Sequence, residues 1–294
     1  MDSHEASLQN AVDVFQRTRP RLFGVAYRVL GTAAEAEDVV QDAWLRWQTT
    51  DRNAVKDPTA FLVTTTTRLA LNVAQSARAQ RETYIGPWLP EPVDTSADPY
   101  LGAERGEALS IAVLLLLEKL NPVERAAYVL REAFAYSHRE IADLLDTTEG
   151  NARQLASRAQ KHVANGRHAS VSNEERDRLL HGFIAAAQSG EVEALERLLA
   201  EDVVSYSDGG GIVTAARVPL LGRTRVAQVV AGFHERFWVG AEVRWSQGNG
   251  QSSALVLRDG LLAAFISVEA TTAGIQQIHF TLSPVKLRAL AATL

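Results

Sequence analysis

The sequence predicts a multidomain chain in which two all-helical domains precede an α+β domain. Helix-start signals recur through the first 180 residues, and a proline-rich segment separates two helical stretches. The last third of the chain instead carries the turn dipeptides Asn249-Gly250 and Asp259-Gly260, which favour β-hairpins. With 294 residues, of which 46% are hydrophobic, the chain is long enough for such domains and is not a disordered polymer.

Composition excludes several classes of function. The chain has no cysteine, which rules out disulfides, Cys-ligated zinc, iron–sulfur clusters and thiol catalysis. We expect no metal and no cofactor. The stretch MDSHEASLQN lacks the features of a secretory signal, and no run approaches the roughly 18 apolar residues of a membrane span. We therefore expect a cytoplasmic protein without a membrane partner.

The first helical domain is predicted over residues 10–84. A helix from about Ala11 ends before Gly31, which is typical of a C-terminal stop. The second helix starts at Thr32, whose spacing to Glu35 predicts a capping box, and Asp57 followed by proline starts the third. Residues 64–67 are four threonines, poor helix formers, so a helix there depends on tertiary packing or on their filling the core.

A linker is predicted over residues 85–103 and a second helical domain over 104–167. The linker holds four of the nine prolines together with Trp88 and Leu89, which are unusual in a passive tether. The second domain contains an apolar run and, at Ser137 and Glu140, a second capping-box spacing.

Residues 137–164 predict two helices joined by a short turn, which is a helix-turn-helix arrangement. The second helix turns Ala152, Leu155 and Ala159 inward. Its outward residues can pair with adenine, guanine or phosphate, as a helix in the major groove requires. The alternative is a solvated basic helix in a bundle. The outward set is Asn151, Arg153, Gln154, Ser157, Arg158 and Lys161.

The segment EAEDVVQDAWLRW predicts an acidic helix. Asp38 and Asp42 lie four residues apart, and Trp44 and Trp47 lie three apart. No histidine or metal-ligand spacing accompanies the carboxylates, so we do not assign them to catalysis. A solvated face and a partner-binding face remain as alternatives.

The α+β domain is predicted over residues 174–290. Ser172 and Glu175 have capping-box spacing, and helices are expected at about 174–188, 191–200 and 224–237. The alternation of Ile278, Phe280 and Leu282 predicts a strand.

Residues 10–165 resemble bacterial sigma factors of the extracytoplasmic-function (ECF) class. The acidic helix and the following TRLALNVAQSARAQRETY resemble their region two, and the helix-turn-helix resembles their region four. The strings GPWLPEP (86–92), DGGG (208–211) and SPVKL (283–287) further resemble the subgroup with a fused SnoaL-like C-terminal domain, the sigma factor J type. The resemblance implies two all-α sigma domains and an α+β SnoaL/NTF2-like cone.

The resemblance also implies partners: core RNA polymerase, through its β′ clamp coiled coil and its β flap, and promoter DNA. Polymerase would be bound by Asp38, Gln41, Asp42, Trp44 and Leu45. The minus-ten element would be read by Arg68, Asn72, Arg78 and Arg81, and the minus-thirty-five element by residues 151–161.

Regulation in cis by the C-terminal domain is implied as well. Two departures from the subgroup's pattern are Ile212, where a lysine is common, and Ser283 and Val285 within an Asn-Pro-Asp-Lys-Leu pattern. The implied regulatory contacts are Trp88, Leu89, Pro90, Glu91, Pro92, Asp208, Gly209, Gly210, Gly211, Pro284, Lys286 and Leu287.

The sequence thus predicts a sigma factor that directs promoter-specific transcription and is not an enzyme. One alternative is a SnoaL-like enzyme or ligand sensor, with an unidentified small molecule in the cone. A repressor or activator that acts without polymerase would need a dimer, and no extended heptad is seen. Side chains open to the enzyme alternative are Tyr206, Asp208, His234, Glu269 and His279.

Overall fold

The computed structural model describes residues 2–96, 109–167 and 169–294, without the side chains of residues 2–8, 78–80 and 82. The described residues form two compact units. The first unit holds those within Met1–Glu82 and Val113–Gly166, together with Leu109. The second holds those within Thr83–Ala97, Ser110–Ala112 and Arg167–Leu294. Both predicted helical domains thus belong to one unit, and the described part of the predicted linker belongs to the C-terminal unit.

The N-terminal part of the first unit consists of α1 (Asp2–Leu30), α2 (Ala33–Thr49), a 3₁₀ turn (Arg52–Ala54) and α3 (Pro58–Glu82). Gly31 ends α1 with a φ of 76°, as predicted. The Asp57 carboxylate accepts from the Ala60 amide at 3.0 Å and starts α3. The capping box predicted at Thr32 is wrong: its hydroxyl donates to the Glu35 carboxylate, so it does not accept from the backbone.

The four-threonine run is helical and packed. Thr66 and Thr67 are fully buried. The hydroxyls of Thr64, Thr65 and Thr67 donate to carbonyls four residues earlier, at 2.7 to 2.9 Å. The bonds satisfy these hydroxyls without stabilising the helix. Burial of Thr66 and Thr67 offsets the poor helix propensity of the run, in agreement with its expected dependence on packing.

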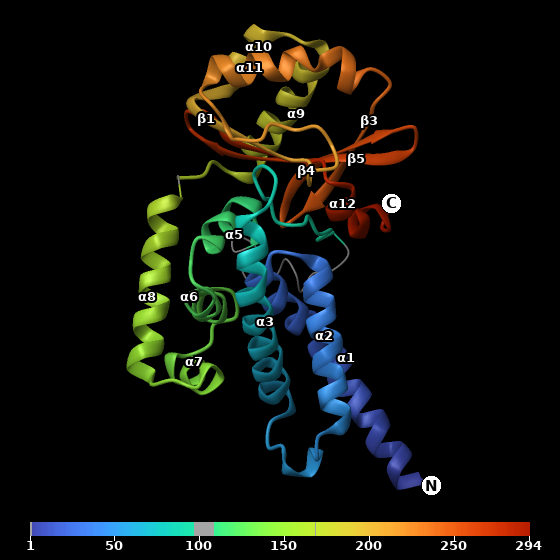
Figure 1. Ribbon diagram of the computed structural model, residues 1–294, viewed down its shortest axis with the longest axis vertical. Helices are drawn as coiled ribbons and strands as arrows, with labels where there is room; N and C mark the ends of the chain where they lie inside the picture. Colours follow the sequence, from blue (N-terminus) through green and yellow to red (C-terminus); the bar gives the residue numbers. More distant parts are fainter. Residues whose placement is uncertain (1, 97–108, 168) are drawn as a thin grey trace. The chain divides into compact units, whose positions relative to one another are not determined.

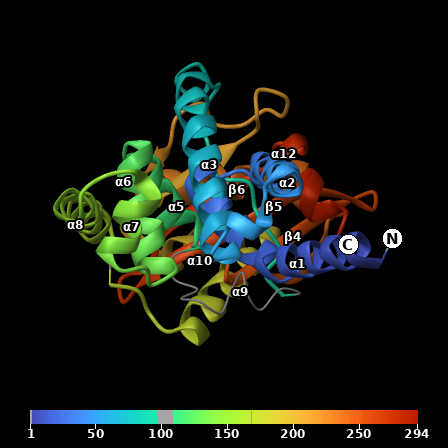
Figure 2. The same ribbon diagram turned by 90° about the horizontal axis from the view of Figure 1, so that it is seen from below.

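The rest of the first unit comprises α5 (Ile111–Glu118) from Val113 on, α6 (Pro122–Tyr128) with a π-helical turn (Val129–Ala133), α7 (His138–Leu145) and α8 (Glu149–Gly166). The capping box of Ser137 and Glu140 forms in full. In α8, Ala152 and Ala159 are fully buried, as predicted. Figure 2 shows α6, α7 and α8 grouped beside α3, which packs against α6 and α7.

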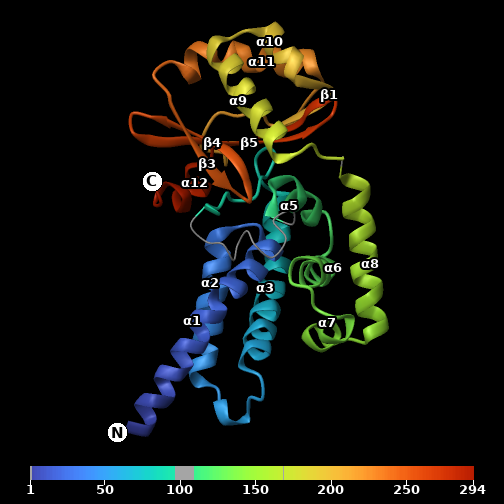
Figure 3. The same cartoon turned by 180° about the vertical axis from the view of Figure 1, so that it is seen from behind.

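The second unit is built on one six-stranded sheet with the order β2-β1-β6-β5-β4-β3. Its pairs are antiparallel except β1 with β6, which run parallel. Helices α9, α10 and α11 lie on one face of the sheet and α12 on the other (Figures 1 and 3). The strands are β1 (Leu199–Asp208), β2 (Leu220–Leu221), β3 (Glu242–Gly248), β4 (Gln251–Arg258), β5 (Leu261–Thr271) and β6 (Gly274–Thr281). The helices are α9 (Asn173–Ser189), α10 (Val192–Leu198), α11 (Arg223–Gly232), a π-helical turn (His234–Trp238) and α12 (Pro284–Ala291).

Both predicted hairpin turns form. Asn249 and Gly250 have φ of 54° and 74°, and Asp259 and Gly260 have 51° and 75°. Positive φ at both turn positions is what a two-residue type I′ turn requires. The helix expected to about residue 200 instead ends at Leu198, and the following strand β1 was not predicted.

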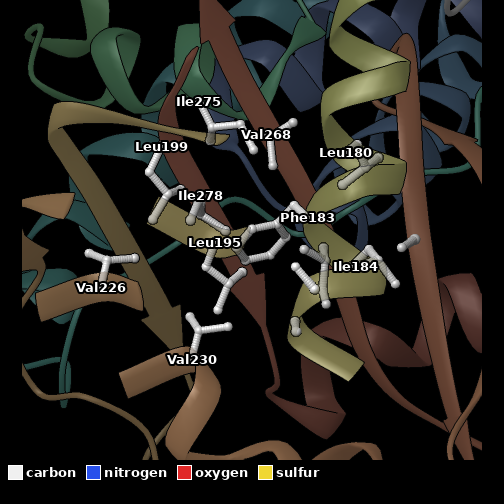
Figure 4. Close-up of a cluster of buried hydrophobic side chains, with 14 of the residues drawn as sticks. Leu180, Phe183, Ile184, Leu195, Leu199, Val226, Val230, Val268, Ile275 and Ile278 are labelled. Atoms are coloured by element: carbon white, nitrogen blue, oxygen red, sulfur yellow. The ribbon is translucent and has the colours of Figure 1, made fainter. Parts of the chain in front are cut away.

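The space between the helices and the sheet is filled by hydrophobic side chains. Phe183 of α9 is fully buried among Ile184, Leu195, Val230 and Ile278 (Figure 4). The helix-covered face of the sheet is therefore an apolar core, not a polar pocket. No helix among the described residues is long and apolar enough to cross a membrane.

Candidate functional site

The outer face of α8 carries polar and basic side chains on a rigid support. The predicted outward residues 151, 153, 154, 157, 158 and 161 are all exposed. Arg153 pairs with Glu149 at 3.2 Å, and Arg158 pairs with Glu124 of α6 at 3.2 Å. Both arginine side chains are more than 60% exposed, so these pairs contribute little stability and the arginines can exchange their carboxylate partners for phosphate. The face can thus meet a nucleic-acid groove without disturbing the core beneath it.

The outer face of α2 is acidic with an apolar edge. Asp38, Gln41 and Asp42 are exposed, and the Leu45 side chain is 51% exposed. Trp44 is half-buried, with its ring centroid 4.8 Å from that of Phe15. Trp47 is buried, and its indole donates to the Ala11 carbonyl at 3.1 Å. The helix is therefore anchored by one tryptophan and leaves its acidic face open to a partner.

The four residues predicted to read DNA on α3 differ in position. Asn72 is exposed, and the side chain of Arg78 lies outside the described residues. Arg68 is exposed, and its Nε lies 3.4 Å from the Leu144 carbonyl of α7. Arg81 is half-buried. Its guanidinium contacts the Leu30 carbonyl, Glu118 and, at 3.8 Å, Glu35, with 14% of the side chain exposed.

Asp208 is the centre of a buried polar cluster in the second unit. One carboxylate oxygen accepts from the Tyr84 hydroxyl at 2.6 Å and from the Gly210 amide at 2.9 Å. The other accepts from the Leu89 amide at 2.8 Å and pairs with Lys286 Nζ at 2.6 Å. Burial, followed by the bond to Asp208, raises the pKa of Tyr84, which therefore stays a proton donor.

Lys286 completes the cluster. Its ammonium also donates to the Leu89 carbonyl and lies 4.4 Å from the Trp88 ring centroid and 4.8 Å from that of Tyr84. The charge is thus held by a carboxylate, a carbonyl and two ring faces. The three short strings singled out in the sequence meet at this point.

The glycines after Asp208 permit the close approach. Gly210 has a φ of 62°, and a Cβ there would lie 2.4 Å from the Ser283 hydroxyl. A Cβ on Gly209 would lie 2.1 Å from the Val213 carbonyl. Of the departures from the subgroup's pattern, Ile212 and Val285 are exposed and lie outside the ion pair. Ser283 is buried, and its amide donates to the Asp208 backbone carbonyl at 3.0 Å.

The segment 84–95, here called the strap, is attached to the sheet at a second place. Asp94 forms an antiparallel bridge with Gly248, at the end of edge strand β3. The Val93 amide donates to the Asn249 side chain at 3.1 Å, and the Asn249 amide donates to the Val93 carbonyl at 2.9 Å. Leu89 between the two attachments is fully buried. The strap is therefore an integral part of the C-terminal unit.

The regulatory residues in and around it differ in exposure. Pro90, Glu91, Pro92 and Leu287 are buried, Trp88 is half-buried, and Gly211 and Pro284 are exposed.

The side chains of the enzyme alternative do not form a catalytic cluster inside the cone. Tyr206 and His279 stack at 5.8 Å, and strand alternation puts them, with Asp208 and Glu269, on the sheet face opposite Ile278. Burial raises the pKa of Glu269, whose carboxylate accepts from Gln251 at 3.1 Å. His234 is half-buried on the π-helical turn beside the Gln188 carbonyl. No His, Asp and Glu group suited to a metal ion occurs among the described residues.

His279 predicts a pH-dependent stability. Burial lowers the pKa of His279 from 6.5 to about 3. Below pH 6.5 this histidine is therefore protonated in the unfolded chain but still neutral in the folded chain, which favours unfolding. We expect the free energy of unfolding to fall by up to about 1.4 kcal/mol per pH unit from this group between pH 6.5 and 3. Urea titrations at pH 7.5, 6.5 and 5.5 on the parent and on His279→Gln measure it. Equal slopes for the two proteins would contradict the assignment.

Comparisons with known proteins address the identity of the chain. The family model Sigma-70 region 2 matches residues 14–81, and Sigma-70 region 4 matches residues 110–163. The ECF RNA polymerase sigma factor SigJ of Mycobacterium tuberculosis is 39% identical over 235 residues, which cover 78% of this chain and 75% of that protein. The chain belongs to the ECF RNA polymerase sigma factors.

Two further likenesses extend over nearly the whole of this sigma factor. The crystal structure of M. tuberculosis SigJ matches it with a TM-score of 0.76 and 31% identity, covering 95% of this chain and 98% of that one. The probable ECF sigma factor SigI of M. tuberculosis is 29% identical over 282 residues, 94% of both chains. The likeness to SigJ thus includes the sheet-containing C-terminal unit.

Three residues of this sigma factor's polar clusters were not predicted from the sequence. Tyr84 is the first residue of the strap and bonds to Asp208 across 124 residues. Glu118 pairs with Arg81. Arg125 donates to the Val29 carbonyl at the end of α1. No local pattern identifies these partners, although a charged residue at the end of the apolar run 111–117 was a visible signal for Glu118.

Proposed function

We propose that this ECF sigma factor binds core polymerase through the acidic face of α2, against the β′ clamp coiled coil. Region four contacts the β flap of the polymerase, while α8 reads the minus-thirty-five element. Residues of α3 read the minus-ten element. The exposed set on α8, above a fully buried inner face, is the observation that carries the proposal. In this proposal the sigma factor acts in the cytoplasm and has no enzymatic activity of its own.

We also propose that the C-terminal unit regulates transcription in cis through the strap. The support is the Asp208 cluster, which joins the strap to β1 and α12. Since the strap connects the two sigma regions along the chain, its attachment limits how far they can move apart. The apolar interior of the cone gives no support to an enzyme or a ligand sensor.

In vitro transcription tests the proposal. Purified core polymerase, the sigma factor and a panel of promoters should give promoter-specific transcripts that disappear when the sigma factor is omitted. Absence of any core-dependent transcript with a folded protein would contradict the proposal.

Two substitutions on α8 should separate base reading from phosphate contact. Gln154→Ala should weaken binding to the preferred promoter by about tenfold and leave binding to other sequences nearly unchanged, because the glutamine amide can pair with one particular base. Lys161→Ala should weaken binding to all DNA sequences alike. It should also reduce the salt dependence of binding by the contribution of about one phosphate contact. Binding of the polymerase holoenzyme to promoter variants at several salt concentrations measures both. Identical profiles for the two variants would contradict groove reading by α8.

A further inference from the structure

The first turn of α8 holds one of its outward side chains in a defined position. The Asn151 side-chain amide donates to the Thr147 hydroxyl oxygen at 2.9 Å. The Asn151 backbone amide donates to the Thr148 hydroxyl oxygen at 3.2 Å. Asn151 is therefore held at both its backbone and its side chain by the two residues that precede α8.

Thr147 is itself fixed to the end of α7. Its amide donates to the Ala142 carbonyl at 2.9 Å, and the residue before it, Asp146, ends α7 in the left-handed conformation. Thr147 is half-buried. The Thr148 carbonyl accepts at 2.9 Å from the amide of Ala152, which is fully buried. The turn between the two helices is thus a firm support for the Thr147 hydroxyl.

This arrangement leaves a donor beside an acceptor on the Asn151 side chain. An asparagine amide has two protons and one carbonyl oxygen, and here one proton is directed to Thr147. The second proton and Oδ1 match the N7 acceptor and the N6 amino group that adenine presents in the major groove. Guanine presents two acceptors there, so Oδ1 would face its O6 with no proton between them.

The position of Asn151 on α8 suits contact with a base edge. It is the third residue of Glu149–Gly166, and the N-terminal residues of a recognition helix are those that contact base edges. Gln154 follows three residues later on the same exposed face. The two are about 4.5 Å apart along the helix axis, at about 1.5 Å per residue. This separation is close to the rise of about 3.4 Å between successive base pairs.

An amide that is held in advance also binds at a lower entropic cost. A mobile asparagine side chain loses rotamer freedom when it pairs with a base, and the bond to Thr147 removes much of that freedom in the protein alone. Thr147 can therefore increase selectivity for a base without touching DNA.

We propose that Asn151 reads an adenine of the minus-thirty-five element and that Thr147 is the positioning residue that holds the amide for this contact. The inference rests on the proposed function of α8. It extends that function to one base and to a residue outside the predicted DNA-contacting set. The adenine should lie within about two base pairs of the base that Gln154 contacts.

Binding of the polymerase holoenzyme to modified promoters tests the base. Each position of the minus-thirty-five element is changed to all four base pairs. The parent should prefer adenine at one position by about tenfold, and Asn151→Ala should lose the preference at that position alone. Replacing this adenine by 7-deazaadenine, which lacks the N7 acceptor, should weaken the parent about fivefold and leave Asn151→Ala unchanged. Equal losses in both proteins, or a lost preference for another base, would overturn the adenine contact.

Two substitutions of Thr147 test the positioning role. Valine has nearly the shape of threonine without its hydroxyl, and serine keeps the hydroxyl. Thr147→Val should lower the adenine preference about threefold, whereas Thr147→Ser should retain it. The control is Thr224→Val, the same change at an exposed position on α11, which should behave like the parent. A full adenine preference in Thr147→Val would overturn the role of Thr147.

The bond to Thr147 can also be followed in the free protein. Nitrogen-15 relaxation of the Asn151 side-chain amide should show more motion in Thr147→Val than in Thr147→Ser or the parent. Equal motion in all three would overturn the positioning role, and their backbone amide spectra show whether each variant is folded.

The inference and the proposed function fail in different ways. If the parent prefers no base in the minus-thirty-five element, the proposed reading by α8 and the adenine contact are both overturned. If base preferences respond to Gln154→Ala but not to Asn151→Ala, reading by α8 stands and the adenine contact is overturned alone.

Discussion

Asp208→Asn is expected to lower the free energy of unfolding of the C-terminal unit by about 3 kcal/mol, because it leaves the Lys286 ammonium buried without its carboxylate. Asp208 is fully buried and Lys286 is 8% exposed, so water cannot replace the lost charge. The new amide NH₂ would also face donors such as the Leu89 amide. Urea unfolding, with hydrogen exchange at the Leu89 amide as the local readout, measures the loss.

The controls separate the ion pair from the side-chain change. Asp259→Asn makes the same substitution at an exposed turn with a φ of 51°, which asparagine adopts readily, and should be nearly neutral. Adding Lys286→Met to Asp208→Asn should recover part of the stability, since the unpaired charge is then absent. A loss below about 1 kcal/mol in the single variant would mean that the pair behaves like one at the surface.

The same variant tests regulation in cis. Asp208→Asn weakens the attachment of the strap to β1, through Tyr84 and Leu89, while leaving the exposed faces of α2 and α8 intact. The ratio of transcripts from different promoters, or their amount at limiting core, should then differ from the parent. Truncation after Gly166 is a harsher test, because it removes the partner of buried Leu89. Transcription equal to the parent's with a demonstrably released strap would contradict cis regulation.

Asp42→Arg is expected to lower the affinity for core polymerase by at least about tenfold, or 1.4 kcal/mol. Asp42 is exposed beside Asp38, so the substitution puts a positive charge into the acidic face proposed to bind polymerase and costs the fold little. Titration of core polymerase with fluorescently labelled sigma factor measures the affinity.

A matched charge reversal controls for net charge. Glu193→Arg changes the total charge equally at an exposed position on α10 of the C-terminal unit, and should leave the affinity within about twofold. Leu45→Ala should weaken binding as well, since its half-exposed side chain forms the apolar edge of the same face. Equal affinities for Asp42→Arg and the parent would remove α2 from the polymerase interface.

Local patterns account for what was predicted correctly. The capping box at Ser137, the stop at Gly31 and the turn at Asn249-Gly250 each depend on residues within four positions of one another. The inward and outward faces of α8 follow from helical periodicity in the same way. Strand β1 was missed because its pairing with β6, more than 60 residues later, has no signal in its own sequence.

The sequence by itself determined most of the helical elements, the hairpin turns, the exposed polar and basic face of α8 and, through motifs, the sigma-factor family. The tertiary structure alone decided that Asp208 pairs with Lys286 across 78 residues and bonds to Leu89 across 119. It likewise decided that Arg81 is committed to Glu118. Local hydrogen bonds and periodicity are encoded by neighbouring residues. The partner of a buried charge depends on which distant segments fold against it. Only such a partner offsets the free-energy cost of removing the charge from water.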